Sequence, residues 1–350
     1  MFDLDVETPC FEKYYLKISS KTNPIHQRLN VNSEVSLSMK KAIAIIVLGL
    51  FLVLIPYNLR AELKKDGTFI LPKDVVKYPH KWKTAFINSL KDYSIQVVSS
   101  NVRFGKKSIR FELRPGDCGV SKSGYSDCKN KSERHELVPQ NKDRDIGYSG
   151  ITWHSISFFA EKFDTSKYDH NSLFQFHGDG DGAPSFNFSL DNSGFTVQRR
   201  TACNVKEIAK KYGGGNWKSG LKACSTRWKE NAYLRIMSKK EMFNKWNDVV
   251  FNIKWSEKQK GFLKMWINGG LIYHNIGSTD TPNESTAFQF GIYRYYGGRS
   301  ISSGINQVAY FDEIRFAKGK KSCKKLKLDD LGYNCKDLEN QSISIIDKIY

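Results

Sequence analysis

The chain has 350 residues, enough for one large all-β domain or two domains of ordinary size. Hydrophobic residues make up 40% and aromatic residues 13%, which is too much apolar surface for a chain that stays disordered over most of its length. The 55 Lys and Arg residues outnumber the 36 Asp and Glu residues, giving a formal net charge of +19. This excess favours a polyanionic partner: a nucleic acid, an anionic lipid surface or an acidic polysaccharide.

The N-terminal part contains a segment with the features of a secretion signal. Met39 is followed by two lysines, an apolar stretch over 42–55 and then Pro56. A short basic region before such a stretch is typical of a signal peptide, and the stretch is short for a membrane span. We therefore expect 39–61 to be a signal peptide, with an uncleaved N-terminal anchor as the alternative, and the protein to be exported. Residues 1–38 are interpreted as a non-native or disordered extension.

The cysteine spacing agrees with an oxidising compartment. Apart from Cys10, which precedes the signal, the six cysteines form three couples of sequence neighbours. None of the couples has the CxxC-like spacing of a zinc site, and locally stapled loops are typical of exported proteins. We predict three disulfides between neighbours: Cys118 with Cys128, Cys203 with Cys224, and Cys323 with Cys335.

The region 93–316 shows the period-two alternation of β-strands. Apolar and polar residues alternate most clearly over 109–114, 186–190 and 249–255. The residues Asn268-Gly269-Gly270 predict a hairpin turn between two further strands. Many short strands with such turns predict an all-β fold, a jelly-roll sandwich of the concanavalin A-like type with short surface helices.

Three segments lie outside this pattern. We interpret 62–92 as an N-terminal lead-in to the jelly roll, and expect surface helices at 79–90 and 205–212. The lysine-rich stretch 317–350 is interpreted as a basic C-terminal tail that is solvated and contains the Cys323/Cys335 loop.

Six stretches, in this order along the chain, resemble the heparin lyase I and glucuronan lyase group of polysaccharide lyases: 110–117 (RFELRPGD), 133–137 (ERHEL), 175–177 (QFH), 246–248 (WND), 261–269 (GFLKMWING) and 289–294 (QFGIYR). The resemblance covers about 93–316. It implies a β-jelly roll whose groove binds a uronic-acid polysaccharide and cleaves it by β-elimination. No cofactor is required for that reaction. The uronate carboxylate must be neutralised, a base must remove the C5 proton, and an acid must protonate the leaving O4.

The resemblance assigns three catalytic residues. His177 matches the family's histidine, as the base or a charge-stabilising partner; the alternative is a strand-end histidine satisfied by hydrogen bonds. Tyr293 matches the tyrosine that protonates O4 or shuttles the proton, and it would need nearby positive charge to act as a base; the alternative is an aromatic anchor in the sheet. Arg134 matches the arginine that binds the substrate carboxylate with its planar fork; the alternative is an internal ion pair with a neighbouring glutamate.

Five further residues are predicted to bind substrate: Gln175, Gln96, Gln289, Arg294 and Tyr295. Gln175 lies two positions before His177 and should share its face of the strand. Gln289 stands where relatives of the heparin type tend to have a lysine. This difference favours an unsulfated uronate, such as glucuronan or alginate, over a sulfated chain.

Other functions are weighed against the lyase. A non-catalytic carbohydrate-binding jelly roll would use the same fold. A glycoside hydrolase would need two carboxyl groups flanking the bond, and the Glu-x-Asp-x-x-Glu strand of such enzymes is absent. The expected export of the protein disfavours a nucleic acid as its partner. We expect contact with a membrane only through an uncleaved N-terminal segment, and a monomer. No metal site is predicted, although Asp179 and Asp181 could contribute to a structural calcium site.

Overall fold

The computed structural model describes residues 62–348 except 66, 80, 85, 122–123, 141–147, 164–169, 179–183, 192–193, 200–232, 257–259, 280–285, 297–304 and 343–346. Several predictions lie outside these residues: the extension 1–38, the signal 39–61, the Cys203/Cys224 pair, the helix at 205–212, and Asp179 with Asp181. None of the helices in the described part of the chain is long and apolar enough to span a bilayer.

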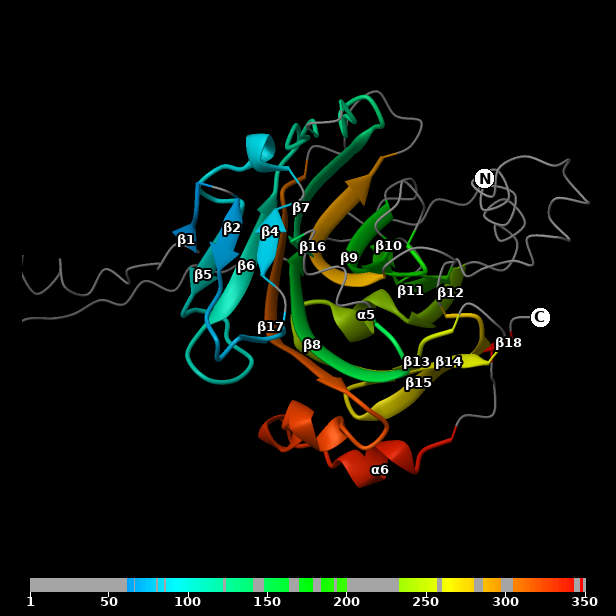
Figure 1. Ribbon diagram of the computed structural model, residues 1–350. Coiled ribbons are helices and arrows are strands. Elements are labelled where there is room, and N and C mark those ends of the chain that lie inside the picture. The colour runs from blue at the N-terminus through cyan, green and yellow to red at the C-terminus, as the bar shows by residue number, and fades with distance from the viewer. Residues whose placement is uncertain are drawn as a thin grey trace, which may run out of the picture. The chain divides into compact units, whose positions relative to one another are not determined.

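The strands form two nine-stranded sheets that pack face to face (Figure 1). Sheet I runs, in spatial order, β1 (Glu62–Leu63), β2 (Thr68–Ile70), β4 (Trp82–Thr84), β7 (Ser132–Pro139), β16 (Ala287–Tyr295), β9 (His170–His177), β10 (Phe186–Asp191), β11 (Gly194–Arg199) and β12 (Tyr233–Met237). Sheet II runs β18 (Asp347–Lys348), β15 (Gly270–Gly277), β14 (Gly261–Ile267), β13 (Trp246–Lys254), β8 (Ile151–Lys162), β17 (Gln307–Lys318), β6 (Ser108–Leu113) and β5 (Ile95–Val98), with β3 (Val76–Lys77) paired to β17.

One hydrophobic core fills the space between the sheets. Successive side chains of a strand point to opposite faces, so the apolar residue at every second position enters the core. Phe111 of sheet II and Phe290 of sheet I, both fully buried, meet edge to face with ring centroids 5.8 Å apart. The two-sheet sandwich of mostly antiparallel strands confirms the predicted jelly-roll class.

The hairpin predicted around Asn268-Gly269-Gly270 is confirmed as β14 and β15, in which Ile267 pairs with Gly270. Asn268 and Gly269 have φ angles of 51° and 83°, the left-handed conformation that this turn requires. The helix expected at 79–90 is wrong. Trp82 and Thr84 are buried on β4, and only the 3-10 turn η1 (Ile87–Ser89) follows.

The segment 62–92 is part of the sandwich rather than a lead-in. Its strands β2 and β4 extend sheet I beyond β7, and β3 pairs in parallel with β17 of sheet II. Trp82 packs edge to face on Phe290, 5.1 Å between ring centroids. The folded unit therefore begins well before residue 93.

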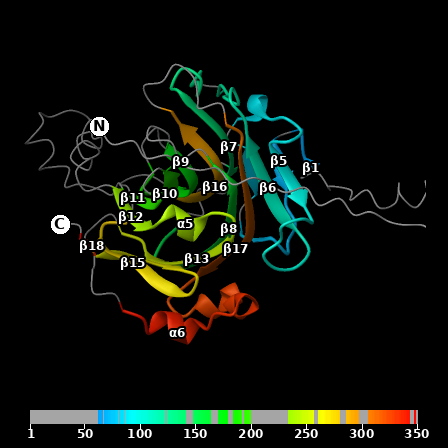
Figure 2. The ribbon, with the colours of Figure 1, turned by 180° about the vertical axis from the view of Figure 1, so that it is seen from behind.

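The prediction of a solvated C-terminal tail is wrong for residues 318–341. Two 3-10 turns, η3 (Cys323–Leu326) and η4 (Leu328–Leu331), and the helix α6 (Cys335–Glu339) lie against the outer face of sheet II (Figures 1 and 2). Their apolar residues Leu326, Leu328 and Leu338 are buried with Trp153 and Trp266 of that sheet. The lysines of this segment stay exposed while the leucines anchor it. The short helix α5 (Lys239–Met242) is a single turn before β13.

Candidate active site

Sheet I carries a strip of polar side chains on the face turned away from the core. We call this the polar strip: Arg134 and Glu136 on β7, Gln289 and Tyr293 on β16, Gln175 and His177 on β9, Asn187 on β10, and Gln198 on β11. Their strand neighbours Leu137, Phe290, Phe176 and Phe188 point the other way, into the core. Period-two alternation therefore brings residues that are far apart in sequence onto one surface.

Gly291 lets β7 and β16 approach at the centre of the strip. Its φ of 142° and its position opposite Glu136 leave no room for a side chain. A Cβ atom there would lie 2.3 Å from the carbonyl oxygen of His135 and 2.7 Å from the Cα atom of Glu136. Glycine is thus required for the close approach of the strands that carry Arg134 and Tyr293.

Arg134 and Tyr293 are direct cross-strand partners. The guanidinium carbon of Arg134 lies 4.4 Å from the centroid of the Tyr293 ring, within the range of a cation–π contact. The arginine also donates from Nε and Nη2 to the carboxylate of Asp127, at 2.8 and 2.7 Å, and from Nη1 to Glu136 at 3.4 Å. The planar fork expected to grip the substrate carboxylate is therefore occupied by Asp127, and the internal ion pair left as the alternative is formed.

Burial sets the protonation of the groups around this pair. Burial raises the pKa of the Tyr293 hydroxyl to about 12, against the opposing effect of the Arg134 charge. Burial also raises the pKa of the Glu136 carboxyl, opposed by Arg134 and by the Gln175 amide, which donates to it at 2.7 Å. At neutral pH, Tyr293 is a protonated phenol that can donate a proton.

His177 lies at the other end of the strip. It pairs with Ala287, whereas Tyr293 pairs with Ser172, so the two differ by five residues of strand, roughly 16 Å at the usual rise. The Gln175–Gln289 pair lies between them. His177 Nδ1 is 2.5 Å from the carbonyl oxygen of Gly178, which can only accept, so Nδ1 is the donor in this contact.

Neutral amides form a row across four strands. Gln289 pairs with Gln175, Gln175 with Asn187, and Asn187 with Gln198, and all four are at most 6% exposed. Asn187 and Gln198 are not among the residues predicted from the sequence. The alternation of these amides with Phe186, Phe188 and Val197 is the signal that could have identified them.

Two predicted substrate-binding residues, Arg294 and Gln96, lie away from the polar strip, and a third, Tyr295, lies at the end of β16. Arg294 is on the core side of β16, fully buried, where its Nε donates to Glu133 at 2.8 Å and its Nη1 to the carbonyl oxygen of Ile305 at 2.7 Å. Gln96 is on β5 of sheet II and accepts a hydrogen bond from Arg110. Because its neighbours Ile95 and Val97 enter the core, Gln96 faces away from sheet I. These positions contradict a shared substrate surface for Arg294 and Gln96. Tyr295 is 43% exposed at the end of β16, two residues from Tyr293.

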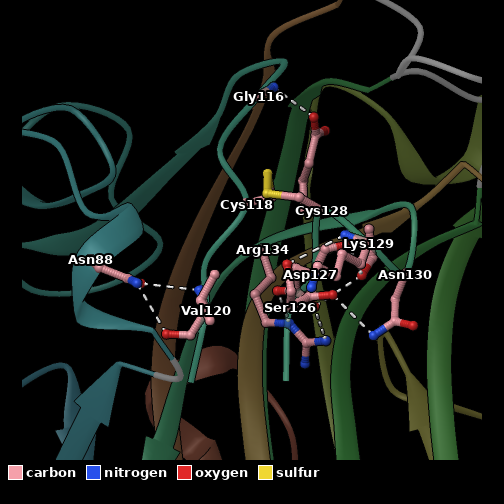
Figure 3. Close-up of a disulfide and its surroundings, with 12 residues drawn as sticks. Asn88, Gly116, Cys118, Val120, Ser126, Asp127, Cys128, Lys129, Asn130 and Arg134 are labelled. Atoms are coloured by element: carbon pink, nitrogen blue, oxygen red, sulfur yellow. Dashed lines mark hydrogen bonds and ion pairs between the residues drawn. A yellow bond between two sulfur atoms is a disulfide. The ribbon is translucent and has the colours of Figure 1, made fainter. Parts of the chain in front are cut away.

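Asp127 reaches the strip from a loop closed by a disulfide (Figure 3). The Cys118–Cys128 and Cys323–Cys335 bonds are both present, which confirms two of the predicted pairs. Asp127 was not among the site residues predicted from the sequence. Its position next to Cys128, a cysteine predicted to form a disulfide, was the signal that could have identified it. Among the described residues, no three His, Cys, Asp or Glu side chains are grouped so that they could hold a metal ion.

Comparison with known proteins places the chain in a family. A family model described as polysaccharide lyase matches residues 77–315. Similar solved structures include an endo-β-1,4-glucuronan lyase from the fungus Trichoderma reesei, with 15% identity, 68% of this chain and 94% of that chain covered, and a TM-score of 0.46. An alginate lyase of polysaccharide lyase family 7 has 14% identity, 72% and 100% coverage, and a TM-score of 0.45. An alginate lyase from Pseudomonas aeruginosa has 17% identity, 66% and 89% coverage, and a TM-score of 0.38. No curated protein matches the chain. The family model spans more than half of the sequence, and the chain belongs to the polysaccharide lyase family.

Proposed function

We propose that this protein is an exported lyase that cleaves an unsulfated uronic-acid polysaccharide by β-elimination and leaves a 4,5-unsaturated uronate at the new non-reducing end. The observation that carries the proposal is the polar strip, which combines a buried phenol, a histidine and a row of amides on one face of sheet I. Export is supported by the two disulfides and by the signal-like segment at 39–61.

The substrate carboxylate is assigned to the amide pair Gln175 and Gln289, assisted by Arg134. Amide N–H groups can hydrogen-bond a carboxylate and so stabilise the negative charge that develops when the C5 proton leaves. Arg134 contributes through the N–H groups that neither Asp127 nor Glu136 occupies. A row of neutral amides, with glutamine where heparin-type relatives tend to have lysine, fits carboxylates better than sulfates.

The proton steps are assigned to the two ends of the strip. Nε2 of His177 takes the C5 proton, the electron pair forms the C4–C5 double bond, and the C4–O4 bond breaks. The Tyr293 hydroxyl then protonates O4, in keeping with its raised pKa. The uronate ring of the substrate would lie over Gln175 and Gln289. The side chains of His177 and Tyr293 would extend toward each other along their strands to reach it.

A substrate panel tests the proposal. The purified protein is incubated with glucuronan, alginate, heparin and hyaluronan, and the ultraviolet absorbance of the unsaturated uronate is followed. We expect the chromophore with glucuronan or alginate and little with heparin. New reducing ends without the chromophore would indicate hydrolysis and overturn the proposal, and turnover of heparin alone would overturn the unsulfated substrate.

A further inference from the structure

The loop closed by Cys118 and Cys128 delivers a buried carboxylate to the candidate site. Asp127 is 0% exposed, and both of its oxygens accept hydrogen bonds from Arg134. Oδ1 also accepts a hydrogen bond from the Ser132 hydroxyl at 2.9 Å. Such a two-pronged pair fixes the plane of the guanidinium group as well as its place.

The backbone of the loop holds Asp127 on both sides. Its N–H donates to the carbonyl oxygen of Gly119 at 2.9 Å, and its own carbonyl accepts from the N–H of Ser132 at 2.9 Å. The disulfide involves the very next residue, Cys128. Figure 3 shows the Asp127 and Arg134 side chains next to each other near this disulfide. The carboxylate therefore has little freedom to leave the arginine.

Both groups that Asp127 holds are in contact with Tyr293. The guanidinium of Arg134 lies over the phenol ring, and the Ser132 side chain is hydrogen-bonded to the Tyr293 side chain. We propose that Asp127 is a positioning residue for Arg134 and Tyr293, and that the Cys118–Cys128 disulfide keeps it in place. The inference deepens the proposed lyase function and rests on it for the roles of those two residues.

The charge of Asp127 gives the inference a measurable consequence. A negative group near a phenol disfavours the phenolate, so Asp127 contributes to the raised pKa of Tyr293. Replacing Asp127 by Asn removes that charge but keeps the size of the side chain. The pKa of Tyr293 should then fall, because the positive charge of Arg134 is less compensated.

The experiment compares Asp127→Asn with Asp117→Asn. The Asp117 side chain is a matched control because it is a buried carboxylate immediately before the same loop, next to Cys118, yet it binds His135 and Tyr93 instead of Arg134 and Tyr293. Tyrosinate absorbance is titrated in each protein with and without the Tyr293→Phe change, so that the difference isolates Tyr293. We expect its midpoint to fall by roughly half a pH unit or more in Asp127→Asn and to stay in place in Asp117→Asn. Equal midpoints in all three backgrounds would overturn the inference.

Turnover supplies the second readout. On the polysaccharide that the wild type cleaves, we expect kcat to fall about tenfold or more in Asp127→Asn with little change in KM, since the loss concerns orientation in the transition state. Asp127→Glu, which keeps the charge, should restore the titration midpoint even if kcat stays low. A wild-type protein that cleaves none of the polysaccharides would refute the proposed function. The titration would still test the effect of Asp127 on the pKa of Tyr293.

The disulfide is tested by two double variants. Cys118→Ala/Cys128→Ala should lower kcat and shift the Tyr293 midpoint, whereas Cys323→Ala/Cys335→Ala should do neither at temperatures where the protein is folded. The two bonds close loops of similar length, with sequence separations of 10 and 12, so a general loss of stability would affect both variants alike. Equal effects of the two variants on kcat would overturn the role of the first disulfide. These two double variants also test the inference if the Asp127→Asn protein does not fold.

Discussion

Arg134 and Tyr293 face each other across β7 and β16, with the guanidinium carbon 4.4 Å from the centre of the phenol ring. An arginine so placed would by itself make the tyrosine more acidic. Here its charge is balanced by Asp127 and Glu136, and burial raises the pKa of Tyr293 to about 12. The pair therefore favours a tyrosine that enters the reaction protonated and gives its proton to the leaving oxygen.

Removing the Tyr293 hydroxyl should abolish most turnover while leaving substrate binding largely intact. Tyr293→Phe keeps the ring under Arg134 but removes the donor, so kcat should fall by about 10²-fold or more with a similar KM. His177→Ala should have a comparable effect. Tyr310→Phe, on β17 of sheet II and so away from the polar strip, is the control and should retain activity. Normal rates in both Tyr293→Phe and His177→Ala would refute the proposed site.

Replacing Arg294 should affect stability rather than substrate binding. Arg294→Met removes the positive charge that pairs with the buried Glu133 carboxylate and leaves it the Gly116 N–H, which costs about 3–5 kcal/mol of unfolding free energy. Urea denaturation measures this loss, and KM measured well below the unfolding temperature should stay unchanged. The double variant Glu133→Gln/Arg294→Met should recover part of the stability. An increased KM in a stable Arg294→Met protein would restore a binding role for this residue.

Opening the Cys323–Cys335 disulfide should loosen the C-terminal segment without altering catalysis. The bond closes a loop with a sequence separation of 12, so replacing both cysteines by serine should lower the unfolding free energy by about 3 kcal/mol. Thermal unfolding and proteolysis near residues 318–341 report the change. Since this segment covers sheet II and the polar strip belongs to sheet I, a lowered kcat in the folded variant would contradict this separation.

Asp312 should make stability depend on pH. Burial raises the pKa of its carboxyl to about 7, although the backbone N–H groups of Phe104 and Arg103 oppose this. The folded state therefore holds a proton that the unfolded chain loses near pH 4. Unfolding free energy from this group is present below that pH and is lost as pH rises to about 7, by on the order of 4 kcal/mol.

The comparison with Asp312→Asn isolates this effect from other titrating groups. Urea denaturation at intervals between pH 4 and pH 8 should show the variant gaining stability relative to the wild type as pH rises. A constant difference across that range would show that Asp312 is ionised throughout.

The sequence predicted the sandwich because the patterns that indicate strands and hairpin turns are local. The alternation at 109–114 and the Asn-Gly-Gly turn after Ile267 depend only on neighbouring residues, and both were confirmed as β6 and the β14–β15 hairpin. The C-terminal segment was misread because Leu326, Leu328 and Leu338 lie in short 3-10 and helical turns, whose spacing has no regular period, among exposed lysines. Their burial depends on Trp153 and Trp266, which come from distant strands.

The candidate site was predicted only in part, because its geometry depends on contacts between distant segments. Arg134 and Tyr293 were identified from the sequence stretches that resemble the family. The pairing of their strands and the hydrogen bonds between Asp127 and Arg134 depend on contacts between segments, which the sequence does not show. Arg294 could have been excluded from sequence, because adjacent residues on a strand point to opposite faces and Tyr293 already faces outward. Gln96 could not, since nothing local assigns its strand to one sheet or the other.

The family match ends at residue 315, but the folded unit does not. A shortened protein expressed to those limits would lack residues 318–341 and leave the indole rings of Trp153 and Trp266 facing water. It would also lose β2, which pairs with the outer edge of β4. An apolar patch and an unpaired strand edge are both routes to aggregation. Soluble expression of this enzyme therefore depends on residues on both sides of the segment by which its family is recognised.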